Sequence, residues 1–255
     1  MLPPTAAEAE PEPTANPASP PAPPAPLRSP WRAWAEIVLC SGYPTQIMLG
    51  EALKDAGIAP LNANGSLSAT FVFALSLGDT AVLVALMLWL LIRNGEQPRQ
   101  VFFGTRRAGE EAVVGLLSVP FVVAMVLALT LVIRAVAPSL RNVPENPLAG
   151  LLGTQTGLLA FLVVVIVAGG LREELQRAFL LHRFSHDLGS TGAGLLITSV
   201  AFGLGHTLQG WDAAILTGAL GAAWGAIYLT RGSAVASIVS HSLFNCGELL
   251  RAFLR

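Results

Sequence analysis

The sequence predicts an all-α, polytopic bundle of seven or eight membrane-spanning helices with a disordered Pro/Ala-rich amino-terminal tail. Of its 255 residues, 53% are apolar and only 12% are charged, about half the charged share of a soluble domain. So few charged side chains could not cover a soluble surface of this size, whereas a chain in hydrocarbon needs them only at helix ends, in loops and at working sites. The apolar residues also fall in runs of about 20, the length of one helical crossing.

Residues 1–30 form the predicted tail. They hold 11 of the 18 prolines and no aromatic residue. Such a segment cannot bury a core, so we expect a disordered, partly polyproline-II leader. It lacks the basic start and continuous apolar run of a signal peptide. Helical structure is expected to begin at Ser29-Pro30-Trp31, where serine can cap and proline fits the first turn.

The rest of the chain alternates long apolar runs with short polar breaks. We expect seven spans, with an eighth segment as the alternative, near residues 31–50, 67–92, 112–136, 157–182, 191–208, 212–230 and 234–250. Pro120 is expected to kink the third span, and 137–156 has room for a short interfacial helix. We assign 31–150 to amino-terminal membrane helices and 151–255 to a functional core.

The break at residues 93–111 holds the densest group of positive charges in any loop. By the positive-inside rule it predicts the cytoplasmic side, and we expect a protein of the bacterial plasma (inner) membrane with its active site toward the cytoplasm. A net charge of -1 without a basic run gives no footprint for nucleic acid. Cys40 and Cys246 both lie in apolar stretches, so we expect core residues and no disulfide.

Ionisable groups form a cluster inside an apolar span at one place, where the chain reads LREELQRAFLL from Leu171 to Leu181. Glu173, Glu174 and Arg177 would each cost about 2.5–3.5 kcal/mol at the centre of a membrane helix, so they need partners. Arg177 lies four and three residues after the two acids and can pair with either. An ion pair at a helix end is the simple interpretation. The second carboxylate is nevertheless left over and is a candidate general base.

His206, His241 and Asn245 are the next polar groups inside the spans. His241 and Asn245 are four residues apart and so share one helical face. Counting helical rise from the polar turns places Glu173 about 22 Å and His206 about 27 Å from the turn near residue 188. If the hairpin at 182–187 projects beyond the hydrocarbon, the polar groups lie in one layer of the membrane.

Three other features are interpreted as structural. His182 and His186 have an HxxxH spacing but lie on what we expect to be a wet loop, about 13 Å along the axis from Glu173. Asp79 is an isolated acid that could serve a transporter but more simply lines a polar patch. Small residues at three- and four-residue steps in the sixth span permit close helix approach; they are Gly218, Gly221, Ala222 and Gly225.

The ordered motifs resemble a known family. EExxxR at Glu173, Glu174 and Arg177, FxxxH at Phe202 and His206, and HxxxN at His241 and Asn245 are similar to those of the CPBP (Abi, or CAAX protease and bacteriocin-processing) family of intramembrane proteases, which includes the CAAX prenyl endopeptidases. The resemblance covers about residues 150–255. It implies that Glu173 and His206 activate a water, that His241 and Asn245 stabilise the oxyanion, and that Glu174, Arg177 and Phe202 support them.

The resemblance leaves two questions open. Glu173, His206 and His241 could supply three ligands to zinc, but we favour a metal-free glutamate mechanism without cofactors, because there is no HExxH motif. The expected activity is an intramembrane endopeptidase acting on a membrane-anchored, prenylated or leader-bearing protein in the lipid bilayer. A non-proteolytic membrane adaptor or immunity protein of the same fold is the alternative, and a small transporter is third because no inverted repeat is evident.

Overall fold

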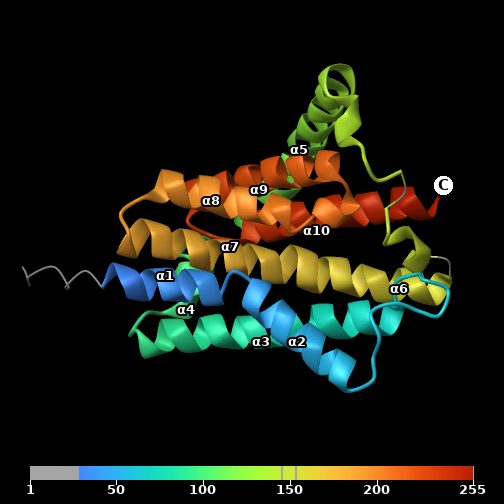
Figure 1. The fold of residues 1–255 in the computed structure, drawn as a ribbon. Coiled ribbons are helices and arrows are strands. Elements are labelled where there is room, and N and C mark those ends of the chain that lie inside the picture. The colour runs from blue at the N-terminus through green and yellow to red at the C-terminus, as the bar shows by residue number, and fades with distance from the viewer. Residues whose placement is uncertain (1–28, 145, 153, 255) are drawn as a thin grey trace, which may run out of the picture.

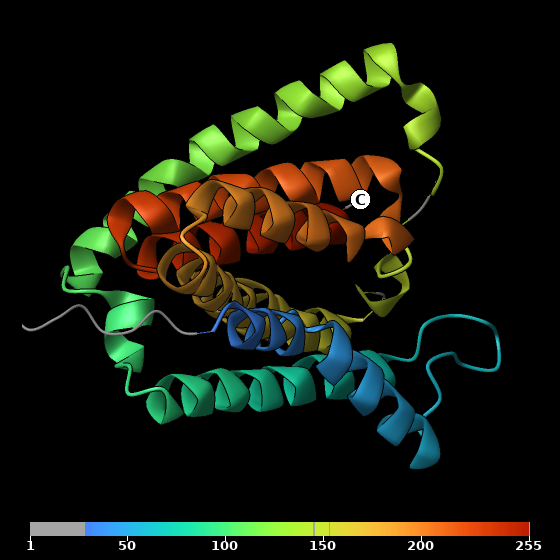
Figure 2. The ribbon, with the colours of Figure 1, turned by 60° about the vertical axis from the view of Figure 1, so that its left-hand side comes forward.

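The structure, a computed structural model, describes residues 29–144, 146–152 and 154–254. The predicted tail lies outside these residues except for its last two positions. The described chain is all-helical, as predicted, and within it the only β-type pairing is an isolated bridge between Leu61 and Leu67. Most of the helices lie side by side in one bundle, while the second half of α5 leans away from it (Figures 1 and 2).

In chain order the helical elements are α1 (Pro30–Leu39), α2 (Tyr43–Asp55), α3 (Ala69–Arg93), α4 (Pro98–Phe103), α5 (Ala108–Val136), the 3-10 turns η1 (Pro138–Leu140) and η2 (Ala149–Leu152), α6 (Gln155–Val164), the π-helical η3 (Val165–Arg172), α7 (Glu173–His182), the π-helical η4 (Arg183–Asp187), α8 (Thr191–Leu204), η5 (Thr207–Gln209), α9 (Trp211–Arg231) and α10 (Val235–Phe253).

Three of these segments are long and apolar enough to cross a membrane. They are α3, the segment Pro98–Val136 and α9, while α8 is apolar but shorter. The fold is therefore that of an integral membrane protein, and the number of crossings stays a prediction. Pro120 lies inside α5, which continues on both sides of it. In 137–156, where the sequence has room for a short interfacial helix, the described residues form two short 3-10 turns and the start of α6.

The first predicted span is two helices rather than one. The chain breaks between Leu39 and Tyr43, where Gly42 has a left-handed φ of 87°. A side chain there would be strained, so glycine permits the turn. The carbonyl of Cys40 at the break accepts a hydrogen bond from the Gln176 amide at 2.9 Å. The sequence interpretation missed the break because the apolar run continues through it.

The fourth predicted span ends too early at residue 182. Helical structure runs on to Asp187, so the expected wet loop is a helical end. The side chain of Arg183 is fully buried there and pairs with Glu36 at 2.6 Å, Glu96 at 2.7 Å and Asp187 at 3.6 Å. These three acids make burial of the cation tolerable, and they tie α1 and the α3–α4 turn to the end of α7.

Small residues let α8 and α9 approach closely, as predicted. A Cβ at Gly203 would lie 3.2 Å from the Cα of Gly218, and one at Gly225 would lie 2.5 Å from Leu195. The two helices lie side by side in Figure 1. Close packing of this pair holds the segment that precedes His206 against the bundle.

The main apolar core joins α1, α3, α4 and α7. Its fully buried members include Cys40, Leu83, Met87, Leu91, Phe179 and Leu181. Cys40 is thus a core residue, as predicted, whereas Cys246 is half-buried; both are free thiols. Because α7 packs into this core, the polar groups at its amino-terminal end are held by a rigid element.

Candidate active site

Glu174 lies at the first turn of α7 and is almost fully buried, with 1% of its surface exposed. One of its carboxylate oxygens accepts a hydrogen bond from Arg177 and a second from Nδ1 of His241 at 2.8 Å. The simple ion pair expected at this helix therefore forms, and it extends to α10. Glu174 thus contacts His241 directly, and Arg177 contacts it only through Glu174. The roles predicted for Glu174 among the catalytic residues and for Arg177 as a supporting residue stay predictions.

Glu173 is the more open of the two acids, with 17% of its side chain exposed. One oxygen accepts a hydrogen bond from Arg172 at 3.0 Å, and the other lies 3.8 Å from Nε2 of His241. Arg177 does not share its charge with Glu173, because it pairs with Glu174. The leftover carboxylate predicted from the sequence is thus Glu173, and it faces the second nitrogen of the same imidazole.

Arg172 connects Glu173 to the amino-terminal half of the protein. Its guanidinium lies 3.4 Å from Asp79 on α3 and donates to Gln176 at 2.9 Å. Asp79 is 1% exposed and accepts further hydrogen bonds from Thr45 and Gln46. Asp79 is therefore the counter-charge of Arg172, beyond the polar patch that the sequence suggested.

The imidazole of His241 lies flat on the indole of Trp224. The ring centroids are 3.7 Å apart and the planes differ by 15°. Trp224 is itself 1% exposed and donates its indole N–H to Ser240 at 3.2 Å. With Nδ1 bonded to Glu174, this stack fixes both the ring plane and the direction of Nε2.

His206 follows the end of α8 and is half-buried. Its Nδ1 lies 2.8 Å from the carbonyl of Phe202, which can only accept, so Nδ1 carries a proton; in the neutral imidazole Nε2 is then the nitrogen with the lone pair. The Phe202 ring contacts His206 edge-on at 4.9 Å and lies 4.6 Å below the guanidinium of Arg177. Phe202 thus touches both His206 and Arg177, and its supporting role stays a prediction.

Asn245 lies one helical turn beyond His241 on α10, beside η3. A Cβ at Gly169 would come within 2.7 Å of the Asn245 amide nitrogen, and one at Gly170 would collide with Ser242. The two glycines let α10 approach closely enough to place Asn245 next to the segment that carries Glu173. The π-helical turn of η3 ends at Arg172, immediately before this acid, and such turns are frequent at functional sites.

The predicted residues come together in part. Glu173 and Glu174 both lie within 4 Å of His241, while His206 is joined to them through Phe202. Among the residues described, Glu173 and His206 form no direct ion pair, and no three His, Cys, Asp or Glu side chains converge as a metal site. The ligand set of the zinc alternative is therefore not assembled in this arrangement.

The HxxxH pair lies away from this site, as predicted. His182 contacts Glu96 and His186 contacts Asp187 at 2.9 Å, at the opposite end of α7 from Glu173. Their rings stack with centroids 5.2 Å apart. They belong to the charge cluster around buried Arg183.

Sequence reasoning missed Arg172, Trp224 and the role of Asp79. A signal existed for the first and third, because an arginine and an acid in two different spans are each costly alone and predict one another as partners. Trp224 gave no such signal. An aromatic residue among glycines and alanines of a membrane helix is ordinary packing until its neighbour is known.

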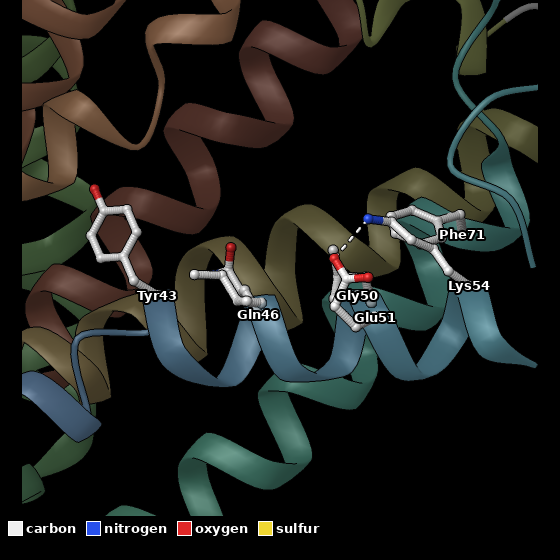
Figure 3. Close-up of a pocket in the computed structure, with 8 residues that line it drawn as sticks. Tyr43, Gln46, Gly50, Glu51, Lys54 and Phe71 are labelled. Atoms are coloured by element: carbon white, nitrogen blue, oxygen red, sulfur yellow. Dashed lines mark hydrogen bonds and ion pairs between the residues drawn. The ribbon is translucent and has the colours of Figure 1, made fainter.

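A shallow groove of about 290 Å³ runs along α2 beside this network (Figure 3). The Tyr43 hydroxyl at one end donates to the carbonyl of Ala201 at 2.8 Å, close to the turn that carries His206. Gln46 lines the groove and also contacts Asp79. At the far end Lys54 pairs with Glu51 at 2.8 Å, as Figure 3 shows. The groove therefore borders both the His206 turn and the residues that support Glu173.

Comparison with known proteins identifies one family. Residues 154–247 match the family model described as type II CAAX prenyl endopeptidase Rce1-like. No curated protein and no solved structure matches the chain. The matched range contains the paired acids, Phe202, His206, His241 and Asn245, so the resemblance found in the motifs is confirmed. Residues 154–247 of this membrane protein are thus similar to the Rce1-like type II CAAX prenyl endopeptidases, which is consistent with the resemblance to the CPBP proteases.

Proposed function

We propose that the protein is an intramembrane endopeptidase that hydrolyses a peptide bond of a membrane-anchored protein. One observation carries the proposal. The two adjacent acids have different environments. Glu174 is buried and pairs with Arg177 and His241. Glu173 is partly exposed and lies beside Nε2 of the same histidine. An ion pair that only stabilised the fold would not require a second acid beside an oriented imidazole inside the membrane.

In the proposed reaction Glu173 is the general base. It takes a proton from a water molecule as the water oxygen attacks the peptide carbonyl, and the proton then passes to the leaving amine. The lone pair of His206 Nε2 accepts a hydrogen bond from the same water. Its Nδ1–H bond to Phe202 supports this role, because that bond selects the tautomer with a free Nε2.

His241 and Asn245 are the proposed oxyanion donors. The Glu174 carboxylate accepts a hydrogen bond from Nδ1 of His241, so Nε2 is the ring nitrogen that would face the developing negative charge. The Asn245 amide supplies the second donor from the same face of α10. Donors of this kind contribute about 2.7–4 kcal/mol each to the stability of the transition state.

Arg172 and Asp79 are proposed to position the base. Arg172 fixes one oxygen of Glu173 and leaves the other toward His241. Asp79 in turn balances the charge of Arg172. Without that acid, Glu173 would be the one carboxylate left beside the charge of Arg172.

The family description supports a proposal for the substrate class. A prenyl endopeptidase acts on a protein whose carboxy-terminal end carries a lipid, and we propose a membrane-anchored substrate of this type. The groove beside α2 borders the site and is open to the surface. Cleavage of a farnesylated peptide ending in CAAX, compared with the same peptide lacking the farnesyl group and with a leader-bearing peptide, distinguishes the substrate types.

Processing in cells tests the proposal against the adaptor alternative. The Glu173→Ala and His206→Ala variants are expected to accumulate unprocessed membrane-anchored proteins, measured by mass spectrometry of protein termini. If both variants leave all termini as in wild type while partner binding persists, the protein is an adaptor rather than a protease.

A chelation experiment tests the metal-free mechanism. Purified protein that cleaves the peptide is treated with a zinc chelator and then freed of it. We expect full activity after chelation. Loss of activity that returns with added zinc would favour the metal version with Glu173, His206 and His241 as ligands.

A further inference from the structure

A second pocket lies at the junction of α4, α5 and α10, away from the catalytic residues. Its volume is about 510 Å³, and its wall combines three arginines with small and apolar residues. The lining residues are Arg99, Phe103, Gly104, Thr105, Arg106, Arg107, Ala108 and Val235. None of them takes part in the proposed peptide hydrolysis.

The arginines of this pocket keep most of their guanidinium donors without a hydrogen-bond partner among the described residues. In the described part of the chain Arg99 forms no ion pair, and Arg107 is 3.8 Å from Glu110, too far for a hydrogen bond. Arg106 uses its Nε–H on the carbonyl of Arg231 and lies 3.9 Å from Glu111, whose carboxylate is already taken by the Arg231 guanidinium. The remaining guanidinium donors of the three lining arginines are free to bind an anion.

The pocket is built on a fixed frame. Gly104 has φ of 59°, and a Cβ there would collide with the Gly232 carbonyl, so the α4–α5 turn sits directly on the α9–α10 turn. The backbone N–H of Ala234 donates to Phe102 at 2.8 Å across the same junction. The arginine stems therefore project from a rigid base. Helix α5 begins in the pocket wall, and no side chain caps its first backbone N–H groups. These N–H groups are further hydrogen-bond donors for an anion.

The position of the pocket points to a lipid rather than to a soluble anion. Five residues after Ala108, about 7.5 Å along α5, exposed apolar side chains begin with Val113 at 54% and continue with Leu116 at 56% and Leu117 at 63%. Phe103 in the pocket wall is 39% exposed. An anion bound by the arginines would thus lie at headgroup depth, with an apolar helix face directly below it.

We propose that this pocket binds the phosphate headgroup of an anionic phospholipid, with the acyl chains against the outer face of α5. Arginine recognises phosphate through several parallel N–H bonds, and each basic residue near a membrane surface strengthens binding to anionic lipid by roughly fivefold. The binding is independent of the peptide hydrolysis proposed above.

Native mass spectrometry of the full-length protein in detergent, titrated with phosphatidylglycerol, tests this site. Arg99→Gln combined with Arg107→Gln is expected to weaken the first bound phosphatidylglycerol by roughly 25-fold, two arginines at fivefold each. Arg99→Gln alone, which removes no ion pair from the fold, is expected to weaken it about fivefold. The matched control combines Arg141→Gln with Arg251→Gln, two exposed arginines outside the pocket, and is expected to bind as wild type does.

Further arms identify the ligand. Phosphatidylcholine is expected not to compete, and inorganic phosphate at millimolar concentration is expected not to displace phosphatidylglycerol. Equal binding by wild type and the pocket variants, or an equal loss in the control, would overturn the proposal. Full displacement by inorganic phosphate would also overturn it, because the site would then bind a soluble anion. None of these measurements uses peptide cleavage, so they stand or fall separately from the proposed protease activity.

Discussion

The imidazole of His241 stacks on the indole of Trp224, with ring centroids 3.7 Å apart and planes 15° from parallel. The stack lies on one side of a ring whose Nδ1 is bonded to Glu174 and whose Nε2 faces Glu173. Trp224 thus supports one face of the His241 ring, which is the proposed oxyanion donor. An aromatic stack of this kind contributes about 0.5–1.5 kcal/mol beyond simple burial.

Replacing Trp224 with a residue that has no aromatic ring is expected to slow the reaction. Trp224→Leu should lower kcat up to about tenfold, because the imidazole loses the contact that fixes its plane. Trp224→Phe keeps an aromatic face and should retain most of the activity. The measurement is steady-state cleavage of the farnesylated peptide, with thermal unfolding to confirm that both variants fold. Equal activity of Leu and Phe variants would contradict a positioning role.

Asp79 is proposed to position the base Glu173 through Arg172. Asp79→Asn is therefore expected to lower kcat by roughly 10- to 100-fold, because a charge-assisted hydrogen bond contributes a free energy of this size. KM is expected to stay unchanged. If Asp79 acts through Arg172, the double variant with Arg172→Gln should be no slower than Arg172→Gln alone. Arg172→Lys should recover part of the rate.

The matched control for this pair is Glu111→Gln. Glu111 is as fully buried as Asp79 and is also paired with an arginine, Arg231, but it does not touch the site. It is expected to cost stability without changing kcat. Additive losses in the Asp79 and Arg172 double variant would show that Asp79 acts by some other route.

Gly169→Ala is expected to reduce activity by displacing Asn245. The added methyl would come within 2.7 Å of the Asn245 amide nitrogen, so the oxyanion donor must move. Loss of one such donor costs roughly 10²–10³ in kcat. Gly247→Ala on α10 is the control, since a Cβ there meets nothing within 4 Å. A Gly169→Ala variant with wild-type kcat would exclude Asn245 from the oxyanion site.

Acid is expected to loosen the end of α7 through Glu96, which lies in the turn after α3. Burial raises the pKa of Glu96, but the hydrogen bond with His182 and the charge of Arg183 outweigh it and lower the pKa from 4.5 to about 2. A depressed carboxyl pKa stabilises the fold above about pH 4.5, and this contribution is lost as the pH falls toward 2.

Thermal unfolding in detergent between pH 6 and pH 3 measures this effect. Glu96→Gln should be less stable than wild type at pH 6, and the difference should shrink as the pH falls. Glu110→Gln, an exposed acid with a loose partner, should unfold as wild type does throughout. A constant gap between wild type and Glu96→Gln would mean that the charge of Glu96 contributes nothing.

Much of the fold could be predicted because the membrane imposes it. Apolar runs as long as the bilayer is thick leave few alternatives to helix, and the helices α3, α5 and α9 lie where the hydropathy places them. The break at Gly42 and the helical continuation through Arg183 were missed. Both depend on tertiary partners, the Gln176 amide and three acids from other elements, which no local pattern reveals.

The candidate site divides in the same way. Glu173, Glu174 and His241 could be predicted to meet because each is costly in hydrocarbon and needs a partner. The acid that pairs with Arg177 could not be predicted, because spacings of three and four residues along a helix suit an ion pair equally well. The structure assigns Glu174 to Arg177 and leaves Glu173 to Arg172. Arg172 in turn pairs with Asp79, nearly one hundred positions earlier in the chain.

The most direct test of the account is the turnover of Glu173→Gln on the farnesylated CAAX peptide, measured with purified protein in lipid bilayers. Glutamine keeps the shape and the bond to Arg172 but cannot take a proton from water. We predict that kcat falls by about 10²–10⁴, with KM and the unfolding temperature close to wild type. A Glu173→Gln variant that cleaves the peptide at the wild-type rate would contradict the assignment of Glu173 as the base that activates water.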